Sequence, residues 1–119
     1  MAQHNDLGNI GEQKAKEYLV EKEYDILETN WRYRKAEIDI IAQKGNKIIA
    51  VEVKTRSSLE FGNPQEFINQ KKIKLLVEAL DNYIVSKDID LDARFDIVSV
   101  YFDGKNYNVD HIEDAFLFF

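Results

Sequence analysis

The sequence predicts an α/β (α+β) fold in which helices flank a central mixed sheet. Two apolar runs enclose a Gly-Asn pair within residues 37–54, which indicates a β-hairpin. Residues 61–87 carry apolar side chains at helical spacing, and residues 93–102 are rich in strand-forming types. The predicted order is therefore helix, three strands, helix and strand, followed by a short final strand.

The composition of the chain limits the classes of protein to which it can belong. The chain has 119 residues, of which 45% are hydrophobic and 32% charged, so we expect a single globular domain over residues 1–119. The absence of cysteine excludes disulfides and thiolate metal sites. No apolar stretch approaches the roughly 20 residues of a membrane helix, and MAQHNDLGN lacks the order of a signal peptide. These features predict a cytoplasmic protein with no membrane partner.

The first two elements follow from spacing and residue type. Residues 10–23 are predicted to form a helix, because Ala15, Tyr18, Leu19 and Lys22 recur at helical intervals. Residues 24–31, YDILETNW, are predicted to form the first strand. Trp31 at its end is assigned to the core rather than to a base-stacking surface.

The hairpin at residues 37–54 holds four charges inside its apolar runs. A two-residue turn at Gly45 and Asn46 would place Asp39 opposite Glu52, and Glu37 opposite Lys54, on one face. Apolar residues are expected on both faces: Ile41, Ile48 and Ala50 beside the charges, and Ile38, Ile40, Ala42, Ile49, Val51 and Val53 on the other. A hairpin that is apolar on both faces indicates the centre of a covered sheet.

The opposed carboxylates need an explanation, because two negative charges about 5 Å apart repel by roughly 3 kcal/mol at an effective dielectric near 20. A solvated face is one explanation, although the apolar neighbours argue against it. The other is a divalent cation, Mg²⁺ or Mn²⁺, held by Asp39 and Glu52 with help from the Val53 carbonyl. Lys54 would then lie where an ammonium can orient water and meet charge on phosphorus. This arrangement suits metal-assisted phosphodiester hydrolysis.

The remaining elements complete the order. The long helix is predicted over residues 61–87, with Asn63 as N-cap, Pro64 at the first helical position and Glu66 three residues past the cap. Its apolar stripe consists of Ile73, Leu76, Val77, Leu80 and Ile84. A strand over 93–102, a turn over 103–106 and a final strand over 107–112 follow.

Four blocks of the sequence carry a family resemblance: GNIGEQKAKEYL, NWRYRKAEIDIIA, VEVKTRSSLEFG and ARFDIVSV. Together they resemble the YraN family of small bacterial proteins, and the Asp39, Glu52 and Lys54 triplet is similar to that of PD-(D/E)XK nucleases and archaeal Holliday-junction resolvases. The resemblance covers residues 8–116. It implies a restriction-endonuclease-like αβββαβ core, with Asp39 and Glu52 as metal ligands, Lys54 as the catalytic lysine and Glu12 as a further acid of the site.

One position departs from the family pattern. Ala36 stands where a glycine usually precedes the acid of the EID block. Alanine disfavours a left-handed backbone, so the approach of a substrate backbone there would differ.

The distribution of charge bears on DNA as a partner. The net charge of −6 argues against nucleic acid, yet residues 32–74 contain ten basic and five acidic residues. We therefore predict that Arg32, Arg34, Arg56 and Lys71 contact the DNA backbone. A resolvase-like activity would also call for a twofold homodimer that cuts two strands symmetrically.

Several assignments stay open at this point. Glu12 fits either the site or a favourable position near a helix N-terminus. Gln70 and Lys71 fit either phosphate contacts or a solvated helix face. Arg94 and Asp96 share a strand face, which fits an ion pair as well as a role at the site. His4 and His111 show no metal spacing and are assigned no role.

The sequence thus favours a metal-dependent DNA endonuclease, with branched or recombination intermediates as candidate substrates. Two other classes remain. One is a non-catalytic DNA-binding module on the same fold. The intact triplet of Asp39, Glu52 and Lys54 argues against it. The other is a protein-interaction module that uses the acidic, aromatic C-terminal segment. The salt dependence of DNA binding distinguishes phosphate contacts from an apolar interface.

Overall fold

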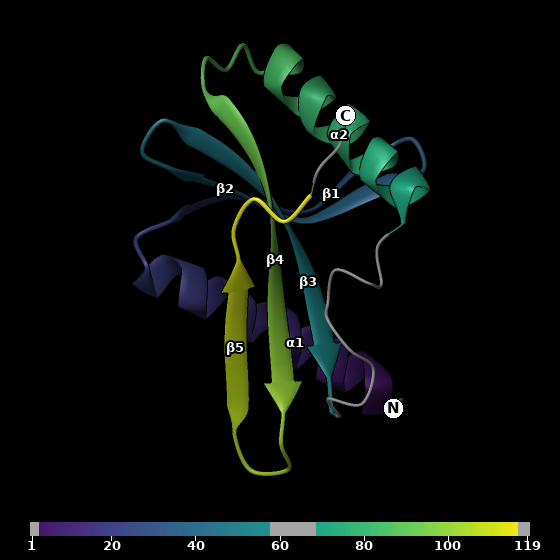
Figure 1. Cartoon of the computed structure of the whole chain (residues 1–119), viewed down its shortest axis with the longest axis vertical. Helices are drawn as coiled ribbons and strands as arrows, with labels where there is room; N and C mark the ends of the chain where they lie inside the picture. The colour runs from purple at the N-terminus through teal and green to yellow at the C-terminus, as the bar shows by residue number, and fades with distance from the viewer. Residues whose placement is uncertain (1–2, 58–68, 117–119) are drawn as a thin grey trace.

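The computed structural model describes residues 3–57 and 69–116, with side chains from residue 8 onward, and is built on a single mixed sheet (Figure 1). The sheet has five strands in the order β1-β2-β3-β4-β5. All neighbours are antiparallel except β3 and β4, which are parallel. The strands are β1 (Asp25–Tyr33), β2 (Ala36–Lys44), β3 (Lys47–Arg56), β4 (Asp92–Phe102) and β5 (Tyr107–Ile112), and the helices are α1 (Gln3–Glu21) and α2 (Gln70–Ser86). This order confirms the predicted fold class and agrees with a restriction-endonuclease-like αβββαβ core.

The two helices cover opposite faces of the sheet. Buried side chains of α1, Ala15 and Leu19, pack in one core cluster with Ile49 and Val51 of β3. Buried side chains of α2 form the other cluster, which includes Ile41, Ile48 and Ala50. The hairpin is apolar on both faces because both are covered, so a solvated face does not account for the buried Glu52, which is 5% exposed.

The turn between β2 and β3 has the predicted two residues. Lys44 pairs with Lys47, and the register continues to Ile40 opposite Val51. Gly45 has φ of 59°, a left-handed conformation that glycine adopts without strain. The ladder ends at Ile40, so the next positions, Asp39 and Glu52, lie where the two strands separate.

Both helices begin at other residues than predicted. Helix α1 begins at Gln3 rather than Ile10, and it includes Gly8 and Gly11 despite their low helix propensity. Helix α2 begins at Gln70, since Asn69 is extended at φ −95° and ψ 172° and accepts a hydrogen bond from the Lys72 N–H at 2.9 Å. An uninterrupted helix from residue 64 is therefore wrong. The predicted cap residues Asn63, Pro64 and Glu66 lie outside the described residues.

One apolar side chain lies on the other face from that predicted. Ile38 packs in the α2-side cluster, whereas Ile40 packs in the α1-side cluster as expected. The neighbouring strand β1 shifts register between Ile26 and Glu28, and its Asn30 has φ of 52°. Ile38 and Ile40 therefore contact different clusters, and the simple alternation is broken around Asp39, where the pairing of β2 with β3 ends.

Within residues 3–57 and 69–116, no helix has the length and apolar character needed to cross a membrane.

Candidate active site

The point where β2 and β3 separate is held by the side chain of Asp39. Its Oδ2 accepts a hydrogen bond from the backbone N–H of Val53 at 2.8 Å. Within the ladder, backbone carbonyls accept the hydrogen bonds between the strands. Beyond Ile40, the carboxylate of Asp39 accepts the bond instead. This bond fixes the carboxyl of Asp39 between the strands, beside Glu52.

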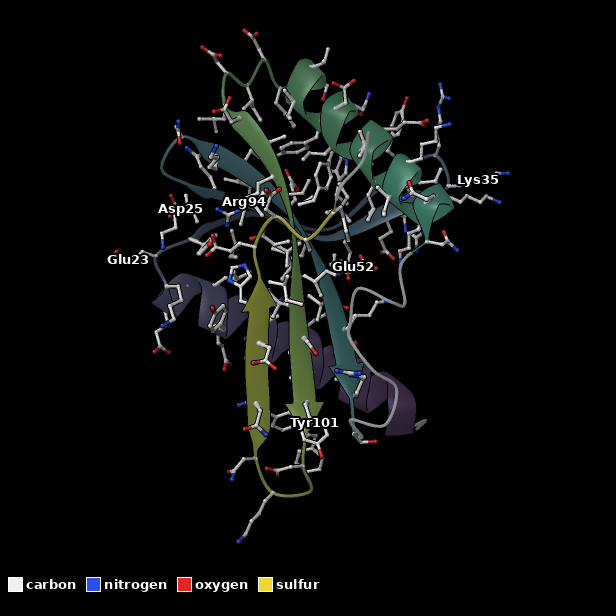
Figure 2. All side chains as sticks on the ribbon, in the orientation of Figure 1. Glu23, Asp25, Lys35, Glu52, Arg94 and Tyr101 are labelled. Atoms are coloured by element: carbon white, nitrogen blue, oxygen red, sulfur yellow. The ribbon has the colours of Figure 1, made fainter. Side chains whose placement is uncertain are left out.

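Glu52 is buried on β3 and contacts two ammonium groups. Only 5% of its side chain is exposed. Its Oε2 lies 3.9 Å from Lys54 Nζ and makes an ion pair with Lys72, which projects from the first turn of α2. Figure 2 shows Glu52 on the opposite side of β4 from Arg94. The two lysines compensate a carboxylate that would otherwise be costly to bury.

The pKa of Asp39 is strongly perturbed. Burial of its carboxyl, together with the nearby charges of Glu52 and Glu12, raises the pKa to about 7. The hydrogen bond from Val53 acts against this shift because it favours the charged form. The repulsion that the sequence predicted is therefore relieved at neutral pH by partial protonation of Asp39.

Glu12 is brought to this site by a close contact of α1 with β3. A Cβ added to Gly11 would lie 2.8 Å from the Cβ of Thr55, so only glycine permits the observed approach of helix and strand. Glu12 follows directly, and its charge acts on the carboxyl of Asp39. Because α1 begins at Gln3, Glu12 lies in the middle of the helix and the N-terminal alternative is wrong.

Glu37 lies outside the site. Its predicted partner was Lys54, but β2 pairs with β1 at this level, and Glu37 forms an ion pair with Arg32 at 3.7 Å. Lys54 instead lies next to Glu52 on its own strand. The prediction failed because the pairing of β2 with β3 ends at Ile40 and Val51, so Glu37 and Lys54 do not face each other.

The predicted DNA-contacting residues lie around the site. Arg32 and Arg34 are exposed at the end of β1 and in the β1–β2 turn, Lys71 is exposed on the first turn of α2, and Arg56 is half-buried at the end of β3. Gln70 is the first residue of α2 and is exposed. Ala36 begins β2 without a positive φ, whereas Arg34 has φ of 57°. Their role toward DNA stays a prediction.

Arg94 and Asp96 belong to a separate buried polar cluster. The guanidinium donates to both oxygens of Asp96, from Nε at 2.9 Å and from Nη2 at 2.8 Å. Asp96 also lies 2.7 Å from His111 Nε2, and His111 lies 3.2 Å from the hydroxyl of Tyr18. These contacts tie β4, β5 and α1 together. The ion-pair interpretation is thus confirmed, and His111 acquires a structural partner that its sequence spacing did not reveal.

The oxygen ligands available to a divalent cation at this site are the carboxylates of Asp39 and Glu52. Among the described residues, no group of three or more His, Cys, Asp or Glu side chains is placed to hold a metal ion. Asp39 and Glu52 instead form a pair of carboxylates. Mg²⁺ is commonly held by one or two carboxylates plus substrate phosphate and water, so this pair fits such an ion.

Lys72, among the described residues that contact Glu52, was not predicted from the sequence. A signal was present, because Lys72 lies four residues before Leu76 and so continues the buried face of α2 toward the sheet. Within QKKIK, however, Lys71, Lys72 and Lys74 look alike by composition. The start of the helix decides which of them points inward.

Comparison with known proteins places the chain in a family. The model of the uncharacterised protein family UPF0102 matches residues 11–100. A UPF0102 protein of Flavobacterium psychrophilum is 56% identical over 119 residues, with the full length of both chains covered. Another from Phocaeicola vulgatus is 40% identical over 116 residues, covering 98% of this chain and 96% of the relative. The chain belongs to the uncharacterised protein family UPF0102, the YraN family.

Proposed function

We propose that this protein is a metal-dependent endonuclease that hydrolyses phosphodiester bonds in DNA. The observation that carries the proposal is the pairing of two carboxyl groups, Asp39 and Glu52, within reach of Lys54. Asp39 is held by the Val53 N–H and has a raised pKa. Strongly perturbed acids next to a cationic side chain are typical of catalytic sites.

The residues of the chain have distinct tasks in this proposal. Asp39 and Glu52 would hold Mg²⁺ or Mn²⁺, which supplies positive charge for the phosphate and lowers the pKa of water. Lys54 is one quarter exposed, so its ammonium can meet a phosphate oxygen from solvent. There it stabilises the negative charge that develops as water attacks phosphorus. The bond from phosphorus to the leaving oxygen breaks, and the proton of water ends on that oxygen.

Glu12 acts through its neighbour. Burial and the charge of Glu52 are the larger causes of the raised pKa of Asp39, and the charge of Glu12 adds to them in the metal-free protein. A carboxylate at this position also supplies a proton acceptor for the attacking water.

The test is a cleavage assay on single-stranded, duplex, flapped and four-way DNA with Mg²⁺ and with Mn²⁺. We expect the wild type to cut at least one of these forms, and Lys54→Ala to cut none. If the wild type cuts no form with either metal but binds DNA, the non-catalytic binding module replaces this proposal. If it neither cuts nor binds, the protein-interaction module does.

A further inference from the structure

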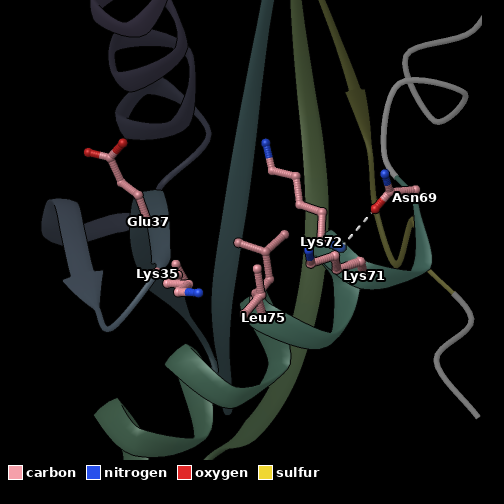
Figure 3. Close-up of a pocket in the computed structure, with 8 residues that line it drawn as sticks. Lys35, Glu37, Asn69, Lys71, Lys72 and Leu75 are labelled. Carbon is pink, nitrogen blue, oxygen red and sulfur yellow. Dashed lines mark hydrogen bonds between the residues drawn. The ribbon is translucent and has the colours of Figure 1, made fainter.

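A groove lies between the β1–β2 turn and the first half of α2. It consists of two adjoining pockets of about 270 and 260 Å³, which share Lys35, Ala36 and Leu75. Figure 3 shows Lys35 and Glu37 on one side of the larger pocket, with Lys71, Lys72 and Leu75 of α2 on the other. The turn and the helix, far apart in the sequence, thus form opposite walls.

The rim of the groove is basic although the whole chain is acidic. Four cations line it, Arg34, Lys35, Lys71 and Lys72, against two acids, Glu37 and Glu78. Glu37 is compensated by Arg32, and Lys72 is compensated by Glu52, so the remaining balance is three cations, Arg34, Lys35 and Lys71, against Glu78. In a chain of net charge −6, this local excess favours an anionic polymer such as nucleic acid.

The floor of the groove is apolar. Ala36, Leu75 and Leu76 line it, and the smaller pocket adds the ring of Tyr33. Duplex DNA presents phosphates on its outside and keeps its bases stacked inside, so its apolar surface cannot reach such a floor. An unpaired strand exposes the faces of its bases, which pack on aromatic and apolar side chains while basic residues follow its phosphates.

We propose that this groove holds unpaired nucleotides of a single DNA strand next to the candidate active site. The inference rests on the proposed function and specifies its substrate as DNA with an unpaired segment. Lys72 provides the connection, since it lines the larger pocket and makes an ion pair with Glu52. A strand in the groove therefore lies beside the paired carboxylates.

The test measures binding of a fluorescent oligothymidylate in EDTA, where no cleavage occurs. The variant Lys35→Ala/Lys71→Ala removes one cation from each wall and leaves the Lys72–Glu52 ion pair. We expect at least tenfold weaker binding and a salt slope reduced by about 1.4, the value for two lost single-strand phosphate contacts. The control Lys87→Ala/Lys105→Ala removes the same charge at the end of α2 and in the β4–β5 turn, and should bind within twofold of wild type.

A second probe tests the floor. An abasic strand of the same length keeps the phosphates but lacks the bases, and it should bind roughly tenfold more weakly than oligothymidylate. Equal affinity for both strands overturns the proposal, because the floor then contacts no base. Equal affinity of the groove variant and the wild type for oligothymidylate also overturns it.

Failure of this inference differs from failure of the proposed function. If the wild type cuts duplex DNA with Mg²⁺ but binds oligothymidylate independently of Lys35 and Lys71, the groove proposal is wrong and the nuclease proposal stands. If the wild type binds oligothymidylate through the groove but cuts no DNA, the groove proposal stands and the nuclease proposal is wrong. Circular dichroism of each variant establishes that it is folded.

Discussion

The carboxylate of Asp39 on β2 accepts the backbone N–H of Val53 on β3 at 2.8 Å, one residue beyond the end of the ladder between these strands. The bond joins the strands where they separate and holds an acid whose pKa is about 7 beside the buried Glu52.

Glu52→Gln should abolish the stabilisation of the protein by Mg²⁺ or Mn²⁺. A ligand stabilises the native state only where it binds, and the substitution removes one of two ligating carboxylates. Metal-free stability should change little, because relief of repulsion with Asp39 offsets the lost contacts to Lys54 and Lys72. The measurement is Tm with and without metal. The control is Glu37→Gln, outside the site, which should show the same metal-induced rise in Tm as the wild type. A rise of equal size in Glu52→Gln would exclude a metal site shared by Asp39 and Glu52.

The stability of the metal-free protein should fall as pH rises from about 4 to about 7. The pKa of Asp39 is higher in the folded chain than in the unfolded chain, so the folded state binds the proton more tightly across this window. The stabilising contribution of Asp39 is present below this window and is lost as the pH rises through the folded pKa. Asp39→Asn removes this contribution, so the difference in unfolding free energy between variant and wild type should grow with pH. Urea denaturation in EDTA at pH 5 and pH 7 measures it. Parallel pH profiles for the two proteins would contradict the raised pKa.

Lys54→Ala should bind DNA and metal but lose cleavage. Both carboxylates remain, whereas the ammonium that meets the charge on phosphorus is removed. The salt slope of DNA binding should decrease by about one phosphate contact. The control is Lys47→Ala, at the start of the same strand, where the lysine contacts Asp92 at 3.6 Å. Cleavage at the wild-type rate by Lys54→Ala would remove this residue from the mechanism.

Lys72→Ala should raise the affinity for divalent cations by a few fold. Its ammonium contacts Glu52 and therefore competes with a metal ion for the same carboxylate. The lysine is partly exposed, so the effect is limited to about 1 kcal/mol, or roughly fivefold. Calorimetric titration with Mn²⁺ measures it. Lys74→Ala, on the exposed face of α2, should bind as the wild type does; a weaker affinity in Lys72→Ala would show that the lysine supports the site.

Gly11→Ala should destabilise the fold by about 1–3 kcal/mol, the usual cost of overpacking. The new methyl group would overlap the side chain of Thr55 and push α1 away from β3. The double variant Gly11→Ala/Thr55→Ala should recover part of the loss, whereas Gly8→Ala, with open space around its Cα, should be neutral or stabilising. Thermal unfolding of the three variants provides the comparison.

Short sequence patterns predicted the features that depend on residues close together in the chain, namely the β2–β3 turn and the buried face of α2. Gly45 and Asn46 fixed the length of the turn, and with it the register from Lys44 to Ile40. The stripe on α2 was also predicted, with Ile73, Leu76 and Leu80 buried. Asp39, Glu52 and Lys54 come together because they lie on one hairpin, where sequence spacing nearly determines distance.

Tertiary contacts decided what the sequence did not reveal. The helix predicted from Ile10 extends to Gln3 in the structure, and its Gly11 lies so close to Thr55 that only glycine permits the contact. The separation of β2 from β3 at Asp39 moved Glu37 to Arg32. Asp96 and His111 lie on different strands, so no spacing rule could connect them.

The order in which these groups meet has a consequence for folding. Asp39 and Glu52 lie thirteen positions apart on one hairpin, an element that forms within about 1–10 μs. Lys72 reaches them only after α2 docks on the sheet, and Glu12 only after α1 docks on the opposite face. Such non-local contacts form later because they close longer loops. A newly made chain therefore brings its two acids together with Lys54 alone, before Lys72 adds the second compensating cation, and a complete site exists only in the finished fold.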